Sequence, residues 1–354
     1  MNYLEYFELT QEAFSNAPVT RFFYNSPQHS QALMKLLYAV ESMKGLAVLI
    51  GDIGAGKTTL ARRLLDSLSP DRYESALLVI IHAGVTAGWV LKRIAGQIGV
   101  KEPSEDKIQL LTQVYNQLLV HQRSGKRVVV LIDEAQMLRT KEIMEEFRGL
   151  LNLEVSEHKL ITFVFFGLPE IDDNLKLDPP LEQRVAVKIR LESFSEDATE
   201  AYIKHRLKLA GAKRMLFTQE AVRSIFQFSS GIPRLINTLS DNALFEGFIL
   251  KVQHVDTRIV ENIAVDLGLT SRPASRKTVG NTAAVKPVTE IPEIRRPAAG
   301  EVRAAETPWT PPGQPIQEAP DVILELDSFG LGGVDEIREI DQILDTLKEK
   351  PAAR

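Results

Sequence analysis

A glycine-rich segment between an apolar run and a helical pattern constrains the fold of this chain more than any other feature. Gly51-Asp52-Ile53-Gly54-Ala55-Gly56-Lys57-Thr58 matches GxxxxGK[ST] and follows the apolar run Leu46 to Ile50. Glycines let successive backbone amides converge on phosphate oxygens at the positive N-terminus of a helix. We therefore predict a phosphate-binding loop in which Lys57 reaches the β and γ phosphates, Thr58 holds Mg²⁺ through its hydroxyl, and Thr59 starts the helix.

A second candidate site follows another apolar run, Val128 to Ile132. Asp133 and Glu134 come directly after it, which places two carboxylates at the C-terminal end of a buried strand, where ligands bind in open α/β sheets. We expect Asp133 to bind the water shell of Mg²⁺ and Glu134 to polarise the attacking water as a general base. Two surface acids at a strand end are common in isolation, but beside a phosphate loop they predict hydrolysis of a nucleoside triphosphate.

Apolar runs and helical patterns alternate up to residue 194, which is typical of a sheet with helical crossovers. Strands buried on both faces are predicted at Leu46 to Ile50, Ala76 to Ile81, Val128 to Ile132 and Leu160 to Phe166. Val185 to Leu191 alternates apolar and polar residues, which predicts one wetter face. A helix over 105–122 is predicted, with Ser104 as its N-cap and its apolar stripe at Ile108, Leu111, Tyr115 and Leu118. The pattern predicts an α/β fold with a parallel sheet.

From Ser195 onward the strand patterns stop. Four helical patterns follow, at 195–210, 218–229, 233–250 and 255–267, and Gly211, Gly231 and Gly268 supply the breaks. Ten of the 18 prolines lie beyond Gly268, in a segment with few large apolar residues that cannot offset its conformational entropy by burial. Apolar residues at helical spacing return over 334–350, as a docking helix or as a solvated helix of no consequence.

Five regions are predicted from these patterns. They are an N-terminal segment with a first helix over 1–45, an α/β nucleotide-binding domain over 46–194, a small all-helical lid domain over 195–268, a disordered Pro-rich linker over 269–333 and an amphipathic terminal helix over 334–350.

Composition narrows the classes of function. The absence of cysteine removes disulfides and thiolate metal sites, and the six histidines lack ligand spacing, which disfavours a transition-metal enzyme. No apolar run approaches the roughly 20 residues that a membrane-spanning helix needs, and the N-terminus lacks a signal-peptide pattern, so we expect a cytoplasmic protein with no membrane span. The net charge of -5 disfavours DNA as a partner, although a local basic patch is compatible with it.

The motifs together resemble one family. The phosphate loop, Asp133-Glu134-Ala135-Gln136 and Gly231-Ile232-Pro233-Arg234-Leu235-Ile236-Asn237 resemble the AAA+ ATPases of the general secretion pathway protein A (ExeA-like) family, which includes relatives from type IV pilus biogenesis. Tyr3 to Leu9, Phe14 and Arg21 to Tyr24 resemble the N-terminal segment of the same family. The resemblance covers about residues 1–268. It implies an AAA+ P-loop NTPase core and Mg²⁺-dependent hydrolysis of ATP.

The resemblance also implies roles for two arginines. Arg234 corresponds to sensor 2, where a lid arginine contacts the γ phosphate, and Pro233 would begin the helix that carries it. Arg184 lies where AAA+ proteins commonly carry an arginine finger that acts on the nucleotide of a neighbour, which implies a ring or helical oligomer. Arg148 competes with Arg184 for this role. An exposed arginine in a salt bridge is the plain alternative.

Two departures from the family pattern affect the expected chemistry. Leu168, in Gly167-Leu168-Pro169-Glu170, stands where relatives tend to have a polar sensor 1 residue, which puts the positioning of water in doubt. His82 stands near the place where many AAA+ proteins have an asparagine that restrains the catalytic glutamate. A histidine at a strand end is more often structural, so no role is assigned to His82.

Three hypotheses follow. The leading one is an ATPase that supports type II secretion or type IV pilus assembly from the cytosolic side, through an inner-membrane or envelope-machine partner that can recruit it to the inner membrane. The second is a DNA-associated ATPase that regulates transposition, for which the lid offers a basic patch of Lys204, His205, Arg206, Lys208, Lys213 and Arg214. The third, prompted by Leu168, is a nucleotide-dependent scaffold that hydrolyses ATP slowly.

Overall fold

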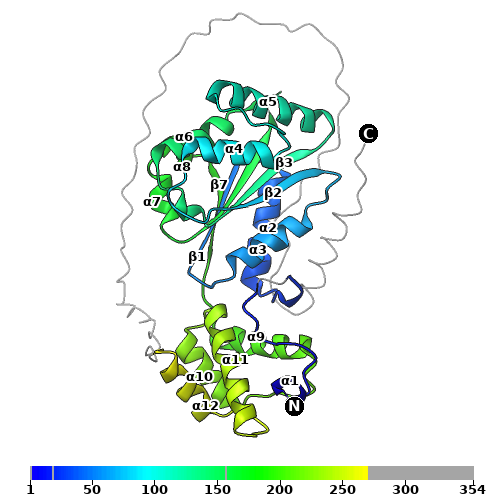
Figure 1. Cartoon of the computed structure of the whole chain (residues 1–354), viewed down its shortest axis with the longest axis vertical. Coiled ribbons are helices and arrows are strands. Elements are labelled where there is room, and N and C mark those ends of the chain that lie inside the picture. Colours follow the sequence, from blue (N-terminus) through cyan, green and yellow to red (C-terminus); the bar gives the residue numbers. More distant parts are fainter. Residues whose placement is uncertain (1, 18–19, 156–157, 270–354) are drawn as a thin grey trace, which may run out of the picture. The chain divides into compact units, whose positions relative to one another are not determined.

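The computed structural model describes residues 2–17, 20–155 and 158–269. Its centre is a parallel sheet of five strands in the order β2-β3-β6-β1-β7 (Figure 1). The strands are β1 (Leu46–Gly51), β2 (Tyr73–Val79), β3 (Arg127–Asp133), β6 (Ile161–Gly167) and β7 (Val185–Leu191). The predicted parallel α/β sheet is confirmed.

The position of each strand in the sheet explains its sequence pattern. β1 and β6 are buried along their whole length, because each has a neighbour on both sides and helices on both faces. β7 is an edge strand whose burial alternates, as its sequence predicts. β2 is the other edge strand. It begins three residues before the predicted Ala76 and ends at Val79, and Ile81, predicted to be in the strand, is 80% exposed.

Helices cover both faces of the sheet. On one face lie α2 (Pro27–Glu41) and α3 (Lys57–Ser67), which pack against Ala47 and Leu49 of β1. On the other face lie α4 (Ala87–Gln97), α5 (Lys107–Arg123), α6 (Lys141–Leu150), α7 (Ile171–Leu175) and α8 (Pro179–Glu182). The side chains of Val48 and Ile50 belong to the core on that side. Alternate residues of each central strand thus enter different cores.

The helix predicted over 105–122 is present with a different start and a different buried stripe. α5 begins at Lys107 with Asp106 as its N-cap, whose side chain accepts a hydrogen bond from Gln109 N, so Ser104 is not the cap. Ser104 Oγ instead accepts from Asp106 N at 3.1 Å. The buried residues are Leu110, Val114 and Leu118, and Ile108 is 76% exposed. The predicted stripe is therefore wrong at its first residue, which lies in the solvent-facing first turn.

The described residues after Phe194 form a group of helices. They are α9 (Glu196–Leu209), α10 (Gln219–Ser229), α11 (Pro233–Ile249) and α12 (Thr257–Asp266). Ser195, Thr218 and Asp256 cap three of them through their side chains, and Gly211, Gly231 and Gly268 have positive φ at the predicted breaks.

The N-terminal segment contributes to two cores. α1 (Tyr3–Tyr6) precedes Phe7, Leu9, Ala13 and Phe14, which are buried among the helices α9 to α12. A single turn of 3-10 helix, η1 (Thr20–Phe22), leads to α2, which covers the sheet. Among the described residues, the remaining secondary structure is η2 (Ala135–Met137) and the short antiparallel pair β4 (Glu154–Val155) and β5 (His158–Lys159).

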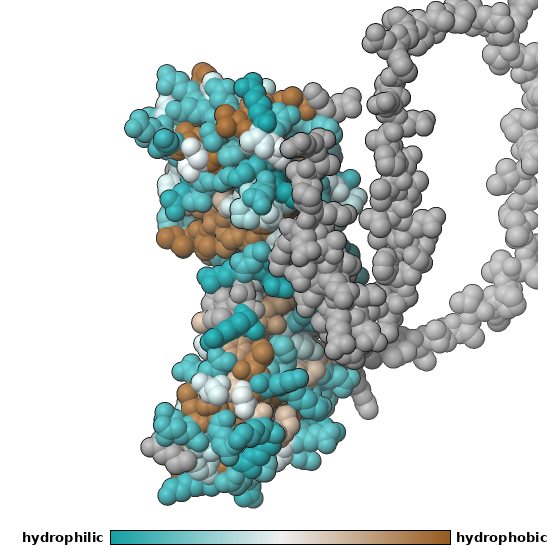
Figure 2. Space-filling model, turned by 90° about the vertical axis from the view of Figure 1, so that its right-hand side faces the viewer, coloured by the Kyte–Doolittle hydropathy of each residue, from teal (hydrophilic) through white to brown (hydrophobic). Residues whose placement is uncertain are grey.

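The linker predicted over 269–333, apart from its first residue, and the helix predicted over 334–350 lie outside the described residues. Within the described ranges, each helix is too short or too polar to cross a membrane. Exposed large apolar side chains include Ile81 and Ile108 in the α/β part and Phe245 and Ile249 on α11. On the face shown in Figure 2, apolar patches of different sizes lie among hydrophilic surface, and the widest follows the lower edge of the upper part.

Candidate nucleotide site

The predicted phosphate loop joins β1 to α3. Gly54 and Gly56 adopt φ values of 80° and 96°, a left-handed conformation that residues with a Cβ rarely adopt. Gly56 is the N-cap residue of α3, so the helix begins at Lys57 and not at the predicted Thr59. Backbone amides at this helix N-terminus are free of intrahelical partners, and they suit a phosphate group.

The side chain of Lys57 lies over the loop and is only 6% exposed. Its Nζ donates hydrogen bonds to Gly51 O at 2.8 Å and to Asp52 O at 2.9 Å. Burial lowers the pKa of Lys57, while the nearby acids Glu134 and Asp133 act in the opposite direction. An anion close to Nζ would therefore stabilise the charged ammonium group.

The loop and the acidic strand end are in direct contact. Thr58 Oγ1 donates a hydrogen bond to Asp133 Oδ2 at 2.7 Å, and Glu134 N donates to Asp133 Oδ1 at 2.9 Å. Asp133 is 1% exposed, and this burial raises its pKa, although the bond from Thr58 lowers it. Glu134 has φ 56°, a left-handed conformation that is rare for a residue with a side chain. The two predicted motifs thus meet at the carboxyl end of the sheet.

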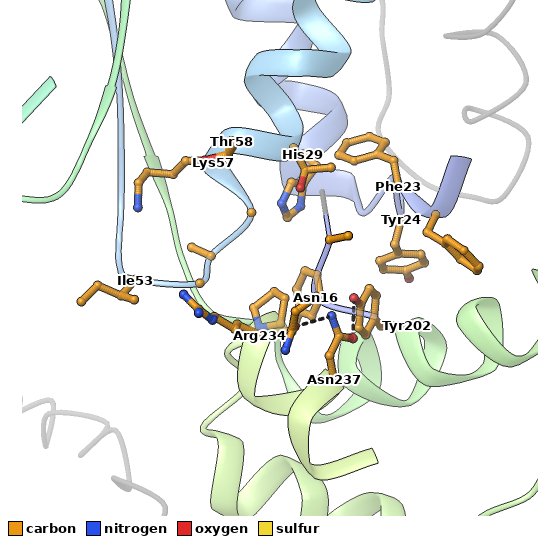
Figure 3. Close-up of a pocket in the computed structure, with 18 of the residues that line it drawn as sticks. Asn16, Phe23, Tyr24, His29, Ile53, Lys57, Thr58, Tyr202, Arg234 and Asn237 are labelled. Atoms are coloured by element: carbon orange, nitrogen blue, oxygen red, sulfur yellow. Dashed lines mark hydrogen bonds between the residues drawn. The ribbon is translucent and has the colours of Figure 1, made fainter. Parts of the chain in front are cut away.

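A cavity of about 550 Å³ opens beside the loop. Its lining includes the loop residues Ile53 to Thr59 with Glu134, and the aromatic residues Phe22, Phe23, Tyr24, Phe194 and Tyr202. Figure 3 shows Ile53, Lys57 and Thr58 at one end of the cavity and Phe23, Tyr24 and Tyr202 at the other end. Asp52 lines a shallower hollow next to it, with Leu168 and Ile232. Of the predicted loop residues, Gly51 lines neither space, and its carbonyl is bound by Lys57.

Side chains from three distant segments meet at the aromatic end. Asn237 Nδ2 donates to Asn16 Oδ1 at 3.1 Å, and Tyr202 Oη donates to Asn237 Oδ1 at 2.9 Å (Figure 3). Arg206 holds the N-terminal segment in place by donating to Ala13 O at 2.6 Å and Ser15 O at 2.7 Å. The family resemblance included the N-terminal segment and Asn237, but no sequence pattern predicted that Asn16, Tyr202 and Asn237 meet here.

His29, from α2, is another residue that the sequence did not predict. It lines the cavity, is 3% exposed and has Ser26 Oγ at 2.7 Å from its Nδ1. Burial lowers its pKa to about 4, and a hydrogen bond with the backbone of Ala55 in the phosphate loop acts in the opposite direction. Its ring also packs edge-on against Phe23 and Phe194. The only sequence signal is the Ser26 cap that directly precedes the helix.

Arg234 lies against the phosphate loop, in the first turn of α11. Its backbone N–H donates to Gly54 O at 3.3 Å, and it is part of the cavity lining (Figure 3). The approach is close, since a Cβ on Gly54 would lie 2.6 Å from Arg234 Cβ. The structure therefore brings the predicted sensor 2 residue to the loop.

Arg184 does not lie at this site. It directly precedes Val185, which pairs with Leu46 at the start of β1, so the length of the strand, about 17 Å, separates it from the loop. Arg184 Nη1 is buried without a hydrogen-bond partner among the described residues. Arg148, the competing candidate, forms an ion pair with Asp178, with Nε 2.8 Å from Oδ2.

The two departures from the family pattern have different surroundings. Leu168 lies at the end of β6, between β3 and β1, and lines the cavity. Its backbone N–H donates to Gln136 Oε1 at 3.1 Å. His82 is exposed, and its ring lies 6.5 Å from that of Trp89.

Several residues of the basic patch proposed for DNA are engaged in intramolecular contacts. Arg206 is 5% exposed, and its guanidinium group donates hydrogen bonds to backbone carbonyls, so it is buried in the interior. Lys204 pairs with Glu200, and Lys213 pairs with Glu8. Arg214 donates to Gln253. Among the described residues of this set, intramolecular contacts take up much of the predicted charge.

Comparison with known proteins agrees with this geometry. Residues 40–175 match the family described as AAA domain. The chain is similar to General secretion pathway protein A of Aeromonas hydrophila, with 34% identity over 249 residues, which is 70% of this chain and 45% of that protein. The chain thus spans less than half the length of this curated relative.

Solved structures share the fold. The ORC2 protein of Aeropyrum pernix, solved as ADPNP-ADP complexes, matches with a TM-score of 0.56 and 14% identity, over 72% of this chain and 71% of that chain. Cdc6p from Pyrobaculum aerophilum matches with a TM-score of 0.53 and 18% identity, over 69% of this chain and 67% of that chain. At such identities the likeness shows the fold alone.

The family match over residues 40–175 agrees with the predicted enzyme class, a P-loop ATP hydrolase. This chain has the fold of the AAA+ P-loop NTPases, and the resemblance of its motifs to the general secretion pathway protein A family is confirmed.

Proposed function

We propose that this chain is a Mg²⁺-dependent ATPase whose site is the cavity between the phosphate loop and the aromatic residues. The observation that carries the proposal is the hydrogen bond between Thr58 and Asp133, at 2.7 Å, which joins the loop to the acidic strand end. Hydroxyl and carboxylate oxygens are ligands that Mg²⁺ prefers, so this donor set fits the cation. Bound Mg²⁺ would supply neutralisation of the charge on the β and γ phosphates.

Different residues of the chain have different roles in the reaction. The loop amides and Lys57 bind the phosphates, and the aromatic end of the cavity receives the nucleobase. Glu134, at the cavity wall, accepts a proton from the attacking water. Arg234 lies close enough to the loop to sense the γ phosphate, since its backbone contacts Gly54.

Assembly is the second part of the proposal. Arg184 lies a strand length from the loop of its own chain, so it can act as a finger only on the nucleotide of a neighbouring copy. A ring or helical oligomer would bring the two together. Measuring the mass of the assembly with ADP and with a non-hydrolysable ATP analogue tests this, and an identical mass with both would contradict it.

The relative from Aeromonas hydrophila supports a link to the secretion machinery. We propose that the chain acts at the cytosolic side of the inner membrane, with type II secretion or type IV pilus assembly as the process it supports. Deletion of residues 334–350 should abolish recruitment to the membrane partner while ATP hydrolysis continues. Unchanged recruitment after the deletion would show that residues 334–350 do not bind the membrane partner.

Single-turnover hydrolysis tests the enzymatic part. Wild type should hydrolyse ATP in Mg²⁺ and stop when EDTA removes the cation. Glu134→Gln should bind ATP and hydrolyse it about 10²- to 10⁴-fold more slowly, because it lacks the base. If the two rates coincide, the chain is a nucleotide-dependent scaffold.

A further inference from the structure

Gln136 lies between the acidic end of β3 and the end of β6. It belongs to the short turn η2 and is 2% exposed. β6 is the strand between β3 and β1, so its end at Leu168 lies between Glu134 and the phosphate loop. A polar side chain buried at such a place requires hydrogen-bond partners.

Both ends of the Gln136 amide have a partner. Its Nε2 donates to Glu134 Oε2 at 2.6 Å, and its Oε1 accepts from the backbone N–H of Leu168 at 3.1 Å. The donor faces an acceptor and the acceptor faces a donor, so these contacts define which way the amide is turned. Gln136 thus forms a bridge from the Glu134 carboxylate to the backbone of β6.

The surrounding residues hold this bridge in place. Asn174 Nδ2 donates to the backbone carbonyl of Gln136 at 2.9 Å. A Cβ on Gly167 would lie 3.1 Å from Gln136 Oε1 and 3.3 Å from Gln136 N, so glycine permits the close approach. The bridge is therefore built into the fold on the β3 side and on the β6 side.

The bridge determines the orientation of Glu134. Its backbone has φ 56° and is fixed by the bond from Glu134 N to Asp133 Oδ1. With one carboxylate oxygen bound to Gln136, rotation of the carboxylate is restricted, and the second oxygen is fixed as well. A general base needs this kind of alignment with its water.

We propose that Gln136 is a positioning residue, which orients Glu134 toward the attacking water and connects it to the end of β6. The side chain of Leu168 has no polar group that could form a hydrogen bond at the end of β6. The hydrogen bonds of Gln136 to Leu168 N and to Glu134 connect β6 to the base instead. The inference rests on the proposed ATPase function, since it concerns the base of that reaction.

The test compares kcat and KM for ATP in the full-length chain. Gln136→Met removes both ends of the bridge with little change in volume, and we expect kcat to fall about 10²-fold while KM and the affinity for Mg²⁺–ATP change less than about 3-fold. Gln136→Glu keeps an acceptor for Leu168 N and loses the donor to Glu134. It should lose a similar factor in kcat.

Gln113→Met is the matched control. The amide of Gln113 also bridges two groups, because it accepts from Ser104 N at 2.9 Å and donates to Glu102 O at 3.1 Å, but it lies outside the cavity lining. Its replacement should leave kcat within about 2-fold of wild type.

A double variant separates positioning from general damage to the fold. In a Glu134→Gln background, Gln136→Met should cause no further loss of kcat, because the group on which Gln136 acts is already gone. A wild-type kcat in both Gln136 variants, or a full additional loss in the double variant, would overturn the positioning role and leave the ATPase intact. Absence of hydrolysis by wild type would overturn the ATPase and the positioning role together.

Discussion

The two ends of the cavity are built in different ways. The phosphate end comes from one continuous segment between β1 and α3, joined to the end of β3. The aromatic end combines residues from three segments, and Asn16 and Asn237, which are hydrogen-bonded to each other, lie 221 residues apart in the sequence.

The geometry of the phosphate end is set by the local sequence, whereas the geometry of the aromatic end is set by tertiary packing. At the phosphate end, glycines adopt backbone conformations that few other residues tolerate, so the sequence itself encodes the geometry. At the aromatic end, ordinary residues acquire their place only when helices α9 and α11 and the N-terminal segment pack together. A change at the phosphate end should therefore weaken every phosphate ligand, whereas a change at the aromatic end should weaken only ligands that carry a base.

The largest expected effect is at Gly54. Gly54→Ala adds a Cβ that would lie 2.6 Å from Arg234 Cβ, at a position with φ 80°, so the loop must shift. We expect the affinities for ATP and for inorganic triphosphate both to fall about 10²-fold, which corresponds to about 2.7 kcal/mol. Calorimetric titration with each ligand measures this.

Gly88→Ala is the control for this substitution. Gly88 lies in α4, and a Cβ there has no atom within 4 Å. The change should leave both affinities at the wild-type value and stabilise the helix by up to about 1 kcal/mol. Wild-type binding by Gly54→Ala would show that the loop does not need its glycine.

The next effect concerns His29, which contacts the loop and the aromatic end together. Burial lowers its pKa from 6.5 to about 4, so the folded state favours the neutral ring. Above pH 6.5 the ring is neutral in both the folded and the unfolded state, and the folded state has its full stability. As the pH falls from 6.5 toward 4, the unfolded state takes up a proton that the folded state does not, so the free energy of unfolding decreases. Between pH 7.5 and pH 5, wild type should lose about 2 kcal/mol of unfolding free energy that His29→Gln does not lose. Urea unfolding at both pH values measures the difference, and equal losses in the two proteins would contradict the assignment.

The smallest effect is expected at the aromatic end. Asn237→Leu removes the hydrogen bonds to Asn16 and Tyr202, which should lower the affinity for ATP about 10-fold, or about 1.4 kcal/mol. Binding of inorganic triphosphate should stay at the wild-type value, because the loop is untouched. Asn242→Leu, on the exposed side of the same helix, is the control. Equal losses for ATP and triphosphate would remove the distinction between the two ends.

The sequence predicted the fold and the site where local rules dominate. The central strands β1, β3 and β6 agree with their apolar runs to within one or two residues, because central strands need continuous burial. The edge strand β7 agrees with its alternating pattern, because one of its faces is more exposed. β2 was less well predicted. It lies at the edge of the sheet, where pairing with β3 and not hydrophobicity sets its limits, so the apolar Ile81 lies outside it.

Residues whose role depends on packing could not be predicted in this way. Ser104 and Asp106 are both good helix caps, and only the three-dimensional path of the chain selects Asp106. His29 and Gln136 carry no motif of their own that indicates a contact with the loop or with β6. Arg206 was predicted to belong to a basic surface patch because basic residues flank it in the sequence. Its guanidinium group is instead buried against backbone carbonyls of the N-terminal segment.

Calorimetric titration of the intact, folded chain with Mg²⁺–ATP tests the central claim most directly. We predict saturable uptake of nucleotide by wild type and its loss in Lys57→Met, because the ammonium group that lies over the loop is then absent. No uptake by the folded wild-type chain, or equal uptake by Lys57→Met, would contradict the claim.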